Sequence, residues 1–240
     1  MDNITLFTYT HSNCKDLWPA YFDLLNQYAP NIKSIVASNE VSDDYHGHKF
    51  VKYEDKHYCQ ELVDIINQNI QTEYFIYMQE DFFLYDSPNW EKINKYVNTM
   101  KSKKVDFVRL IKCGHITELN FEDDLFYIKV PGGPYWSINS YSMQPTIWNK
   151  DRFCEFYKQA NWNAFKENPI YIEALNKTNI LGLYAYNNEP KRGMMHYDSS
   201  VFPYIATALV CGKWNVGEYS AELNPILKKY NIDVNLRGVM

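Results

Sequence analysis

Strand-like and helix-like segments alternate through the first half of this chain, and that alternation constrains the fold more than any other feature. Residues 4–10 (ITLFTYT) alternate apolar and polar side chains, as a half-buried strand does. Apolar residues then recur at helical spacing over 17–28. The alternation continues with strand-like 34–39 and 48–53, helix-like 58–66, strand-like 74–78, a helix that Ser87 caps and Pro88 opens, and strand-like 106–112. We therefore predict an α/β fold with a mainly parallel central sheet flanked by helices.

The second half of the chain is less regular, and it predicts a small antiparallel element beside the parallel sheet. Its expected elements are strands at 125–130, 140–148 and 181–186, a helix at 151–160, and a further helix over 201–211 that Gly212 ends. No Ser/Gly linker, internal repeat or low-complexity tail divides the chain. We therefore expect a single domain over residues 1–240.

Charge and composition argue against several classes of protein. The net charge is −5 and no basic run is present, which speaks against a dedicated nucleic-acid binder. No apolar stretch is long enough to span a bilayer, and the N-terminus lacks the basic start and apolar core of a signal peptide. The five cysteines are scattered without a CxxC pair, which is typical of free thiols in a reducing compartment. We therefore expect a cytoplasmic protein without an integral membrane segment.

Two adjacent acids interrupt the apolar stretch YFIYMQEDFFL at residues 74–84. Glu80 and Asp81 are flanked by aromatic side chains, and an ionised pair in such a place is costly unless a cation or water compensates it. They follow a predicted strand of a parallel sheet, so their loop (79–86) should lie beside the loop that follows the first strand (10–16). That edge of an open sheet is where ligands bind. A solvated pair that begins a turn is the alternative.

The segment Gln79-Glu80-Asp81 resembles the DxD-type motif of GT-A nucleotide-sugar glycosyltransferases, with glutamine in place of the first acid. The resemblance implies a GT-A (Rossmann-like) fold, with 1–112 as the nucleotide-binding half and 113–240 as the half that closes over it and holds the acceptor. It also implies that Asp81 faces a Mn²⁺ or Mg²⁺ ion bridging the donor phosphates, while Glu80 contacts ribose, sugar or metal. Such cations take one or two carboxylates together with phosphate and water. Gln79 makes the need for metal a question for experiment.

The same resemblance extends along the chain and implies roles for further residues. The loop FTYTHSNCKDLWP is similar to the loop that passes over the base and ribose of the nucleotide, and SYSMQPTIWNKDRF to a segment near the donor sugar or acceptor. The implied nucleotide-sugar contacts are Thr8, Thr10, His11, Lys15, Gln144 and Trp148, with Trp148 stacking on a sugar, and Lys191 and Arg192 on the diphosphate. A core position for Trp148 and a surface position for His11 are the alternatives.

The resemblance also implies where the acid–base chemistry and a second metal ligand lie. Glu167 (in NWNAFKENP) or Asp198 (in HYDSS) would act as the base, and His196 would be the C-terminal metal ligand. A helix cap is the alternative role for Asp198, because Asp is a common capping residue.

The predicted activity is transfer of a sugar from a UDP-, GDP- or TDP-linked donor to a hydroxyl of a glycan or glycoconjugate. With a carboxylate base on the acceptor side, transfer would invert the anomeric centre. Two other classes stay open. One is a sugar-nucleotide nucleotidyltransferase, which usually carries a Gly-rich basic loop where this chain has THSNCKDLWP. The other is a non-catalytic glycan-binding module on the same fold.

Overall fold

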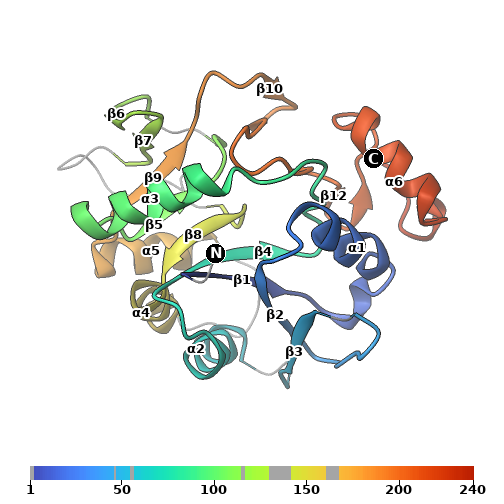
Figure 1. Ribbon diagram of the computed structural model, residues 1–240, viewed down its shortest axis with the longest axis horizontal. Coiled ribbons are helices and arrows are strands. Elements are labelled where there is room, and N and C mark those ends of the chain that lie inside the picture. The colour runs from blue at the N-terminus through green and yellow to red at the C-terminus, as the bar shows by residue number, and fades with distance from the viewer. Residues whose placement is uncertain (1–2, 46, 55–56, 115–116, 130–141, 161–167) are drawn as a thin grey trace.

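The computed structural model describes residues 3–45, 47–54, 57–114, 117–129, 142–160 and 168–240 (Figure 1). Within them, a nine-stranded sheet runs through both halves of the chain in the order β3-β2-β1-β4-β8-β5-β9-β7-β6. Its strands are β1 (Ile4–Tyr9), β2 (Lys33–Ser38), β3 (His48–Lys52), β4 (Tyr74–Gln79), β5 (Phe107–Arg109), β6 (Asn120–Glu122), β7 (Leu125–Tyr127), β8 (Thr146–Asn149) and β9 (Gly182–Ala185). The predicted α/β fold class is confirmed.

Strand direction brings several loops to one edge of the sheet. β3, β2, β1 and β4 are parallel to one another. β8 lies antiparallel between β4 and β5, and β9 is again parallel to β5. The carboxyl ends of β1, β2, β4 and β5 therefore share one edge.

The predicted antiparallel element of the second half is also present. β7 pairs antiparallel with β9 and with β6 at the end of the sheet. Two small hairpins follow, β10 (Lys191–Arg192) with β11 (His196–Tyr197), and β12 (Leu209–Val210) with β13 (Lys213–Trp214). Both hairpins lie in the part of the chain that the sequence marks as less regular.

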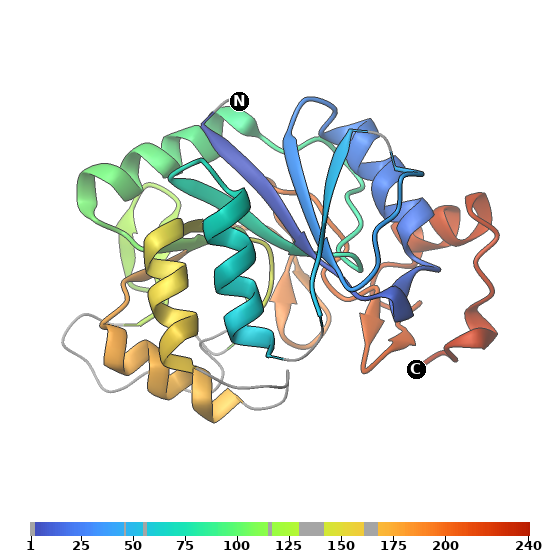
Figure 2. The same cartoon turned by 90° about the horizontal axis from the view of Figure 1, so that it is seen from below.

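Helices cover both faces of the sheet (Figure 2). On one face lie α1 (Trp18–Tyr28) and α3 (Trp90–Lys103), with α6 (Ser220–Lys229) packed beside α1. On the other lie α2 (Tyr58–Asn69), α4 (Lys150–Ala160) and α5 (Asn168–Thr178). Two short 3₁₀ turns complete the described elements, η1 (Ser12–Cys14) and η2 (Val234–Leu236). Each face of the sheet therefore has its own hydrophobic core.

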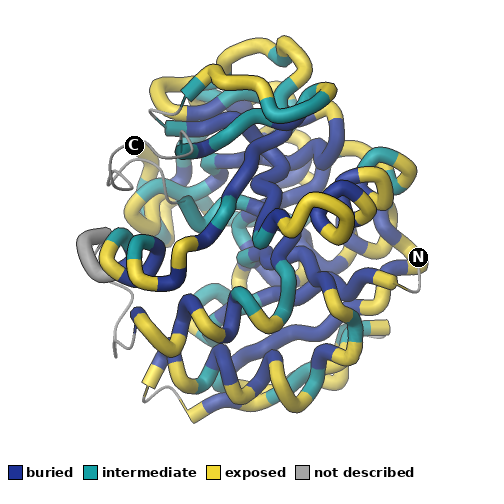
Figure 3. Tube along the Cα trace, turned by 90° about the vertical axis from the view of Figure 1, so that its left-hand side faces the viewer, coloured by how far each residue is buried: buried dark blue, intermediate teal, exposed yellow. Residues whose placement is uncertain are grey.

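The helices alternate buried and exposed residues along their length, while the central strands are buried throughout (Figure 3). In α3 the buried stripe is the one that the sequence indicates, with Ile93, Tyr96, Val97 and Met100 facing the sheet. The predicted start of this helix is wrong by two residues. Asn89, rather than Ser87, is the cap, because its side-chain oxygen accepts a hydrogen bond of 3.0 Å from the Lys92 amide.

The helix predicted over 201–211 is wrong. The segment Val201–Ile205 instead runs antiparallel to residues 83–89, to which it is joined by backbone hydrogen bonds (Asn89 N to Val201 O and Ile205 N to Phe83 O, both 2.8 Å). Pro203 has no amide hydrogen for a helix, whereas its carbonyl here accepts from the Tyr85 amide at 3.2 Å. The apolar side chains of this segment are nevertheless buried, which is why their pattern suggested a helix.

Among the described residues, no helix combines the length and the apolar character that crossing a bilayer requires.

Candidate functional site at the carboxyl edge of the sheet

The acidic pair lies at the carboxyl end of β4, beside the loop that follows β1. β1 and β4 are paired to their last residues, Tyr9 with Gln79, so the two loops leave the sheet together. Glu80 is buried (9% exposed), Asp81 is half-buried, and the Cys14 thiol of the first loop hydrogen-bonds to Glu80. The predicted meeting of the 10–16 and 79–86 loops is confirmed.

Burial makes the ionised form of this pair costly. It raises the pKa of the Asp81 carboxyl from 3.8 to about 7, and the neighbouring Glu80 charge adds to the rise. Burial also raises the pKa of Glu80, although hydrogen bonds donated by Cys14 and Thr10 oppose the rise. The Cys14 thiol, with its pKa raised to about 12 by burial and by Glu80, stays protonated. A cation beside the pair would therefore stabilise its ionised form.

The first-loop residues have structural partners. The hydroxyl of Thr8 shares a 2.7 Å hydrogen bond with that of Tyr21, and the hydroxyl of Thr10 accepts one of 2.9 Å from the Trp18 indole. His11 accepts a hydrogen bond of 3.0 Å from the Asn13 amide and caps η1, while Lys15 pairs with Glu40 at the surface. Their predicted contacts with a nucleotide stay predictions.

Arg237, near the C-terminus, was missed by the sequence analysis. Its Nε lies 2.6 Å from Asp16 Oδ2, and its Nη2 donates a 3.0 Å hydrogen bond to the Asn13 carbonyl. Its charge opposes the rise that burial causes in the pKa of both Glu80 and Asp81. Nothing in the segment DVNLRG has a spacing or motif that indicates this position, because only the fold brings residue 237 to the first loop.

Gln144 lies on the same side of the sheet as segment 201–207. It accepts a 2.5 Å hydrogen bond from the Tyr204 hydroxyl and donates one of 3.3 Å to the Ala206 carbonyl. These two hydrogen bonds fix the Gln144 side-chain amide against segment 204–206.

Trp148, four residues later, belongs to the core. It is 3% exposed, and its ring stacks with Phe107 at 4.4 Å and with Phe156 at 5.7 Å between centroids. The indole is therefore enclosed by protein, and the core alternative that the sequence left open describes this residue. A sugar would have no face of Trp148 to stack on.

A second polar cluster surrounds the β10–β11 hairpin. His196 is buried, with Nε2 3.4 Å from Glu218 Oε2, and its ring stacks on Tyr219. Burial lowers the pKa of this imidazole, an effect that Glu218 opposes. His196 is therefore held as a neutral ring against an acid.

Asp198 and Arg192 belong to the same cluster. Burial raises the pKa of Asp198, while Arg192, whose Nε is 3.6 Å from Asp198 Oδ1, opposes the rise. Oδ1 is buried and has no hydrogen-bond partner among the residues that the structure describes. Arg192 also pairs with Glu222 at 2.8 Å, whereas Lys191 is exposed. Asp198 is thus a half-buried acid whose Oδ1 faces the Arg192 guanidinium without a hydrogen bond to it.

Segment 204–207 connects Gln144 with the second cluster. Tyr204 and Ala206 contact Gln144, and the hydroxyl of Thr207 lies 3.5 Å from His196 Nε2 and donates to Glu218 at 2.7 Å. The acidic pair has its own partners in the first loop. No group of three or more His, Cys, Asp or Glu side chains that could hold a metal ion occurs within the described ranges. Asp81 and His196 as joint metal ligands stay a prediction, and Glu167 lies outside the described residues.

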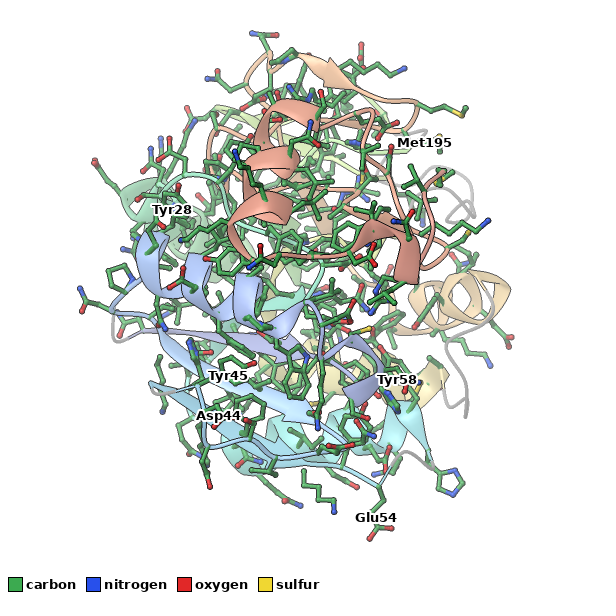
Figure 4. All side chains as sticks on the ribbon, turned by 90° about the vertical axis from the view of Figure 1, so that its right-hand side faces the viewer. Tyr28, Asp44, Tyr45, Glu54, Tyr58 and Met195 are labelled. Atoms are coloured by element: carbon green, nitrogen blue, oxygen red, sulfur yellow. The ribbon has the colours of Figure 1, made fainter. Side chains whose placement is uncertain are left out.

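A cavity of about 420 Å³ lies between α1, α6 and the segment after β4. Figure 4 shows these two helices side by side, with Tyr28 at the end of α1. Leu24, Leu84 and Ile226 line the cavity together with Tyr85 and Glu222. Of the predicted site residues that the structure describes, none is part of this lining.

Comparison with known proteins gives similarity of structure only. No family model and no curated protein matches the chain. Solved structures that resemble it include a CMP:2-keto-3-deoxy-manno-octonic acid synthetase complexed with CTP (TM-score 0.47, 9% identity, 76% of this chain and 88% of that one). A UDP-glucose pyrophosphorylase complexed with UDP-glucose (0.45, 12%, 76% and 90%) and S. aureus TarS (0.44, 10%, 77% and 37%) are also similar.

Proposed function

We propose that this chain is a GT-A-type glycosyltransferase that moves a sugar from a nucleotide-diphosphate donor to a hydroxyl of a glycan or glycoconjugate. The observation that carries the proposal is the position of Glu80 and Asp81. They are two acids at the carboxyl edge of a parallel sheet, beside the loop after the first strand, with the pKa of each raised by burial. An open α/β sheet binds its ligands at that edge.

The charges around the pair fit a divalent cation. Glu80, Asp81 and Asp16 contribute three negative charges when ionised and Arg237 contributes one positive charge, which leaves a net charge of −2 (−3 + 1). Mg²⁺ and Mn²⁺ take one or two carboxylates, with phosphate and water oxygens completing the shell. Asp81, with Glu80 beside it, would hold such a cation, which supplies charge neutralisation for the departing diphosphate.

The protein side chains would supply positioning and proton transfer. Asp198, whose pKa is raised by burial and whose Oδ1 accepts no hydrogen bond from a described residue although Arg192 Nε lies 3.6 Å away, is suited to accept the proton of an acceptor hydroxyl. The acceptor oxygen then forms a bond to the anomeric carbon as the bond to the diphosphate oxygen breaks, and the bonding electrons leave with the diphosphate. Attack from the opposite face inverts the anomeric centre. Glu167 is the alternative base.

A panel of nucleotide sugars tests the proposal. UDP-, GDP- and TDP-sugars are added with Mn²⁺, with Mg²⁺ or with EDTA, and the thermal midpoint is measured, followed by slow hydrolysis of whichever donor stabilises the protein. We expect at least one donor to stabilise the native chain and the Asp81→Ala variant to lose that effect. The proposal fails when no donor stabilises the protein and Asp81→Ala behaves as the native chain.

The same panel separates the alternatives. A nucleotidyltransferase would form a sugar nucleotide and pyrophosphate from a nucleoside triphosphate and a sugar 1-phosphate, with no net transfer to glycans. A glycan-binding module would bind oligosaccharide without hydrolysing any donor. The loop between β1 and α1 contains no glycine, which favours the glycosyltransferase over a nucleotidyltransferase with a Gly-rich loop.

A further inference from the structure

We infer that Arg237 is a built-in counter-ion of the Glu80–Asp81 pair, so that the C-terminal segment 234–240 sets how tightly the pair binds a divalent cation. The inference rests on the cation site of the proposed function and not on sugar transfer itself.

The backbone of segment 234–240 is held in place, which fixes where Arg237 can reach. The Trp214 amide donates to the Gly238 carbonyl at 2.9 Å, and the Met240 amide donates to the Trp214 carbonyl at 3.0 Å. Gly238 adopts a positive φ of 77°, so the chain turns directly after Arg237. The arginine therefore extends from a segment tied to β13 and not from a free tail.

The guanidinium group of Arg237 is docked on the first loop by several contacts. It forms a two-point contact with the Asp16 carboxylate and donates to the Asn13 carbonyl. Between these two residues lies Cys14, whose thiol contacts both Arg237 and Glu80. A single side chain thus separates the guanidinium from the buried acid, in a place where the Arg237 side chain is only 17% exposed.

Arg237 and a divalent cation are both positively charged. Arg237 therefore repels the cation and reduces the negative potential that Glu80 and Asp81 present to it. Asp16 neutralises the guanidinium only in part. Arg237 also contacts the Cys14 thiol beside Glu80, and its charge opposes the rise in the pKa of both Glu80 and Asp81. Removal of the guanidinium leaves Glu80 and Asp81 without that compensation and should strengthen cation binding. If Arg237 only braced the first loop, its removal would loosen the site and weaken cation binding. The sign of the change distinguishes the two roles.

The test uses the full chain and Mn²⁺ alone. Free Mn²⁺ is followed by electron paramagnetic resonance during titration of the native protein, Arg237→Ala, Arg237→Lys and the control Lys229→Ala. Lys229, in α6, pairs with Asp23 of α1 at the surface. We expect Arg237→Ala to bind Mn²⁺ about threefold more tightly or better, with the other two variants close to the native protein. Equal or weaker binding by Arg237→Ala overturns the inference, as does the absence of Mn²⁺ binding in every variant.

A second variant keeps the inference testable if Arg237→Ala does not fold. Arg237→Gln keeps an amide that can hydrogen-bond to the first loop but removes the charge, so Mn²⁺ binding should again strengthen about threefold. Unchanged or weaker binding by Arg237→Gln overturns the inference. The donor panel in EDTA is independent of these titrations, so failure of the counter-ion role and failure of the glycosyltransferase proposal give different results.

Discussion

Replacement of Asp81 by asparagine should stabilise the protein at alkaline pH, at the expense of any function of the carboxylate. Burial and the Glu80 charge raise the pKa of Asp81 from 3.8 to about 7 in the folded chain. Between pH 3.8 and about pH 7, the folded state therefore keeps a proton on Asp81 that the unfolded state has released. A group of this kind destabilises the fold as pH rises through that window, and its full effect is reached above pH 7.

The size of the effect follows from the same two pKa values. The window spans about three pH units, and each unit corresponds to about 1.4 kcal/mol, so the ionised Asp81 costs at most about 4 kcal/mol at pH 8. At pH 5 the corresponding cost is only about 1–2 kcal/mol, because the folded chain then keeps Asp81 protonated. Asp81→Asn should therefore gain about 2–3 kcal/mol more at pH 8 than at pH 5.

Chemical denaturation in urea at pH 5 and pH 8, in EDTA, measures this difference as the free energy of unfolding. Asp86→Asn is the matched control, because Asp86 lies in the same loop but is exposed. We expect the control to change the free energy of unfolding by less than about 0.5 kcal/mol at either pH. Saturating Mn²⁺ should stabilise the native chain at pH 8 and leave Asp81→Asn unaffected.

Two results would refute this reasoning. One is a variant no more stable than the native chain at pH 8, which would mean that the carboxylate is well compensated in the fold. The other is an equal gain at pH 5 and pH 8, which would mean that the asparagine improves packing or hydrogen bonding and that ionisation is irrelevant.

Three further substitutions test other parts of the structure. Trp148→Ala should lower the free energy of unfolding by about 3–5 kcal/mol in urea titration, because it leaves a cavity at a stacked core position. The KM for donor should stay unchanged in the folded protein. A rise in KM with no loss of stability would contradict the core assignment. Ser199→Ala should cost about 1–3 kcal/mol in the same assay, since its hydroxyl donates to the Leu110 carbonyl at 2.6 Å and accepts from the Phe202 amide. Asp198→Asn should abolish transfer and retain donor binding by thermal shift; retained kcat would exclude Asp198 as the base.

The sequence predicts the parallel part of the fold well because each element there carries its own pattern. The strand over Ile4–Tyr9 and the stripe of α3 are readable from apolar spacing alone, and the chain order then dictates that the loops after β1 and β4 meet. The location of the Glu80–Asp81 pair follows from that order without any contact being known.

Other features depend on contacts between distant segments, which spacing does not encode. Val201–Ile205 is apolar like a buried helix, yet its backbone partners are residues 83–89. The family resemblance implies that Trp148 stacks on a sugar, but Phe156 of α4 packs against its ring instead. Arg237 reaches the first loop from the end of the chain.

The pairing of residues 83–89 with Val201–Ile205 also determines when during synthesis this edge can form. Asn89 and Val201 are 112 positions apart (201 − 89), so the backbone of the loop that bears Glu80 and Asp81 gains its partners only after most of the chain has emerged from the ribosome. Until then, the amides and carbonyls of 83–89 are exposed to solvent or to other chains. We expect N-terminal fragments that end before residue 200 to aggregate, because residues 83–89 then lack their backbone partners.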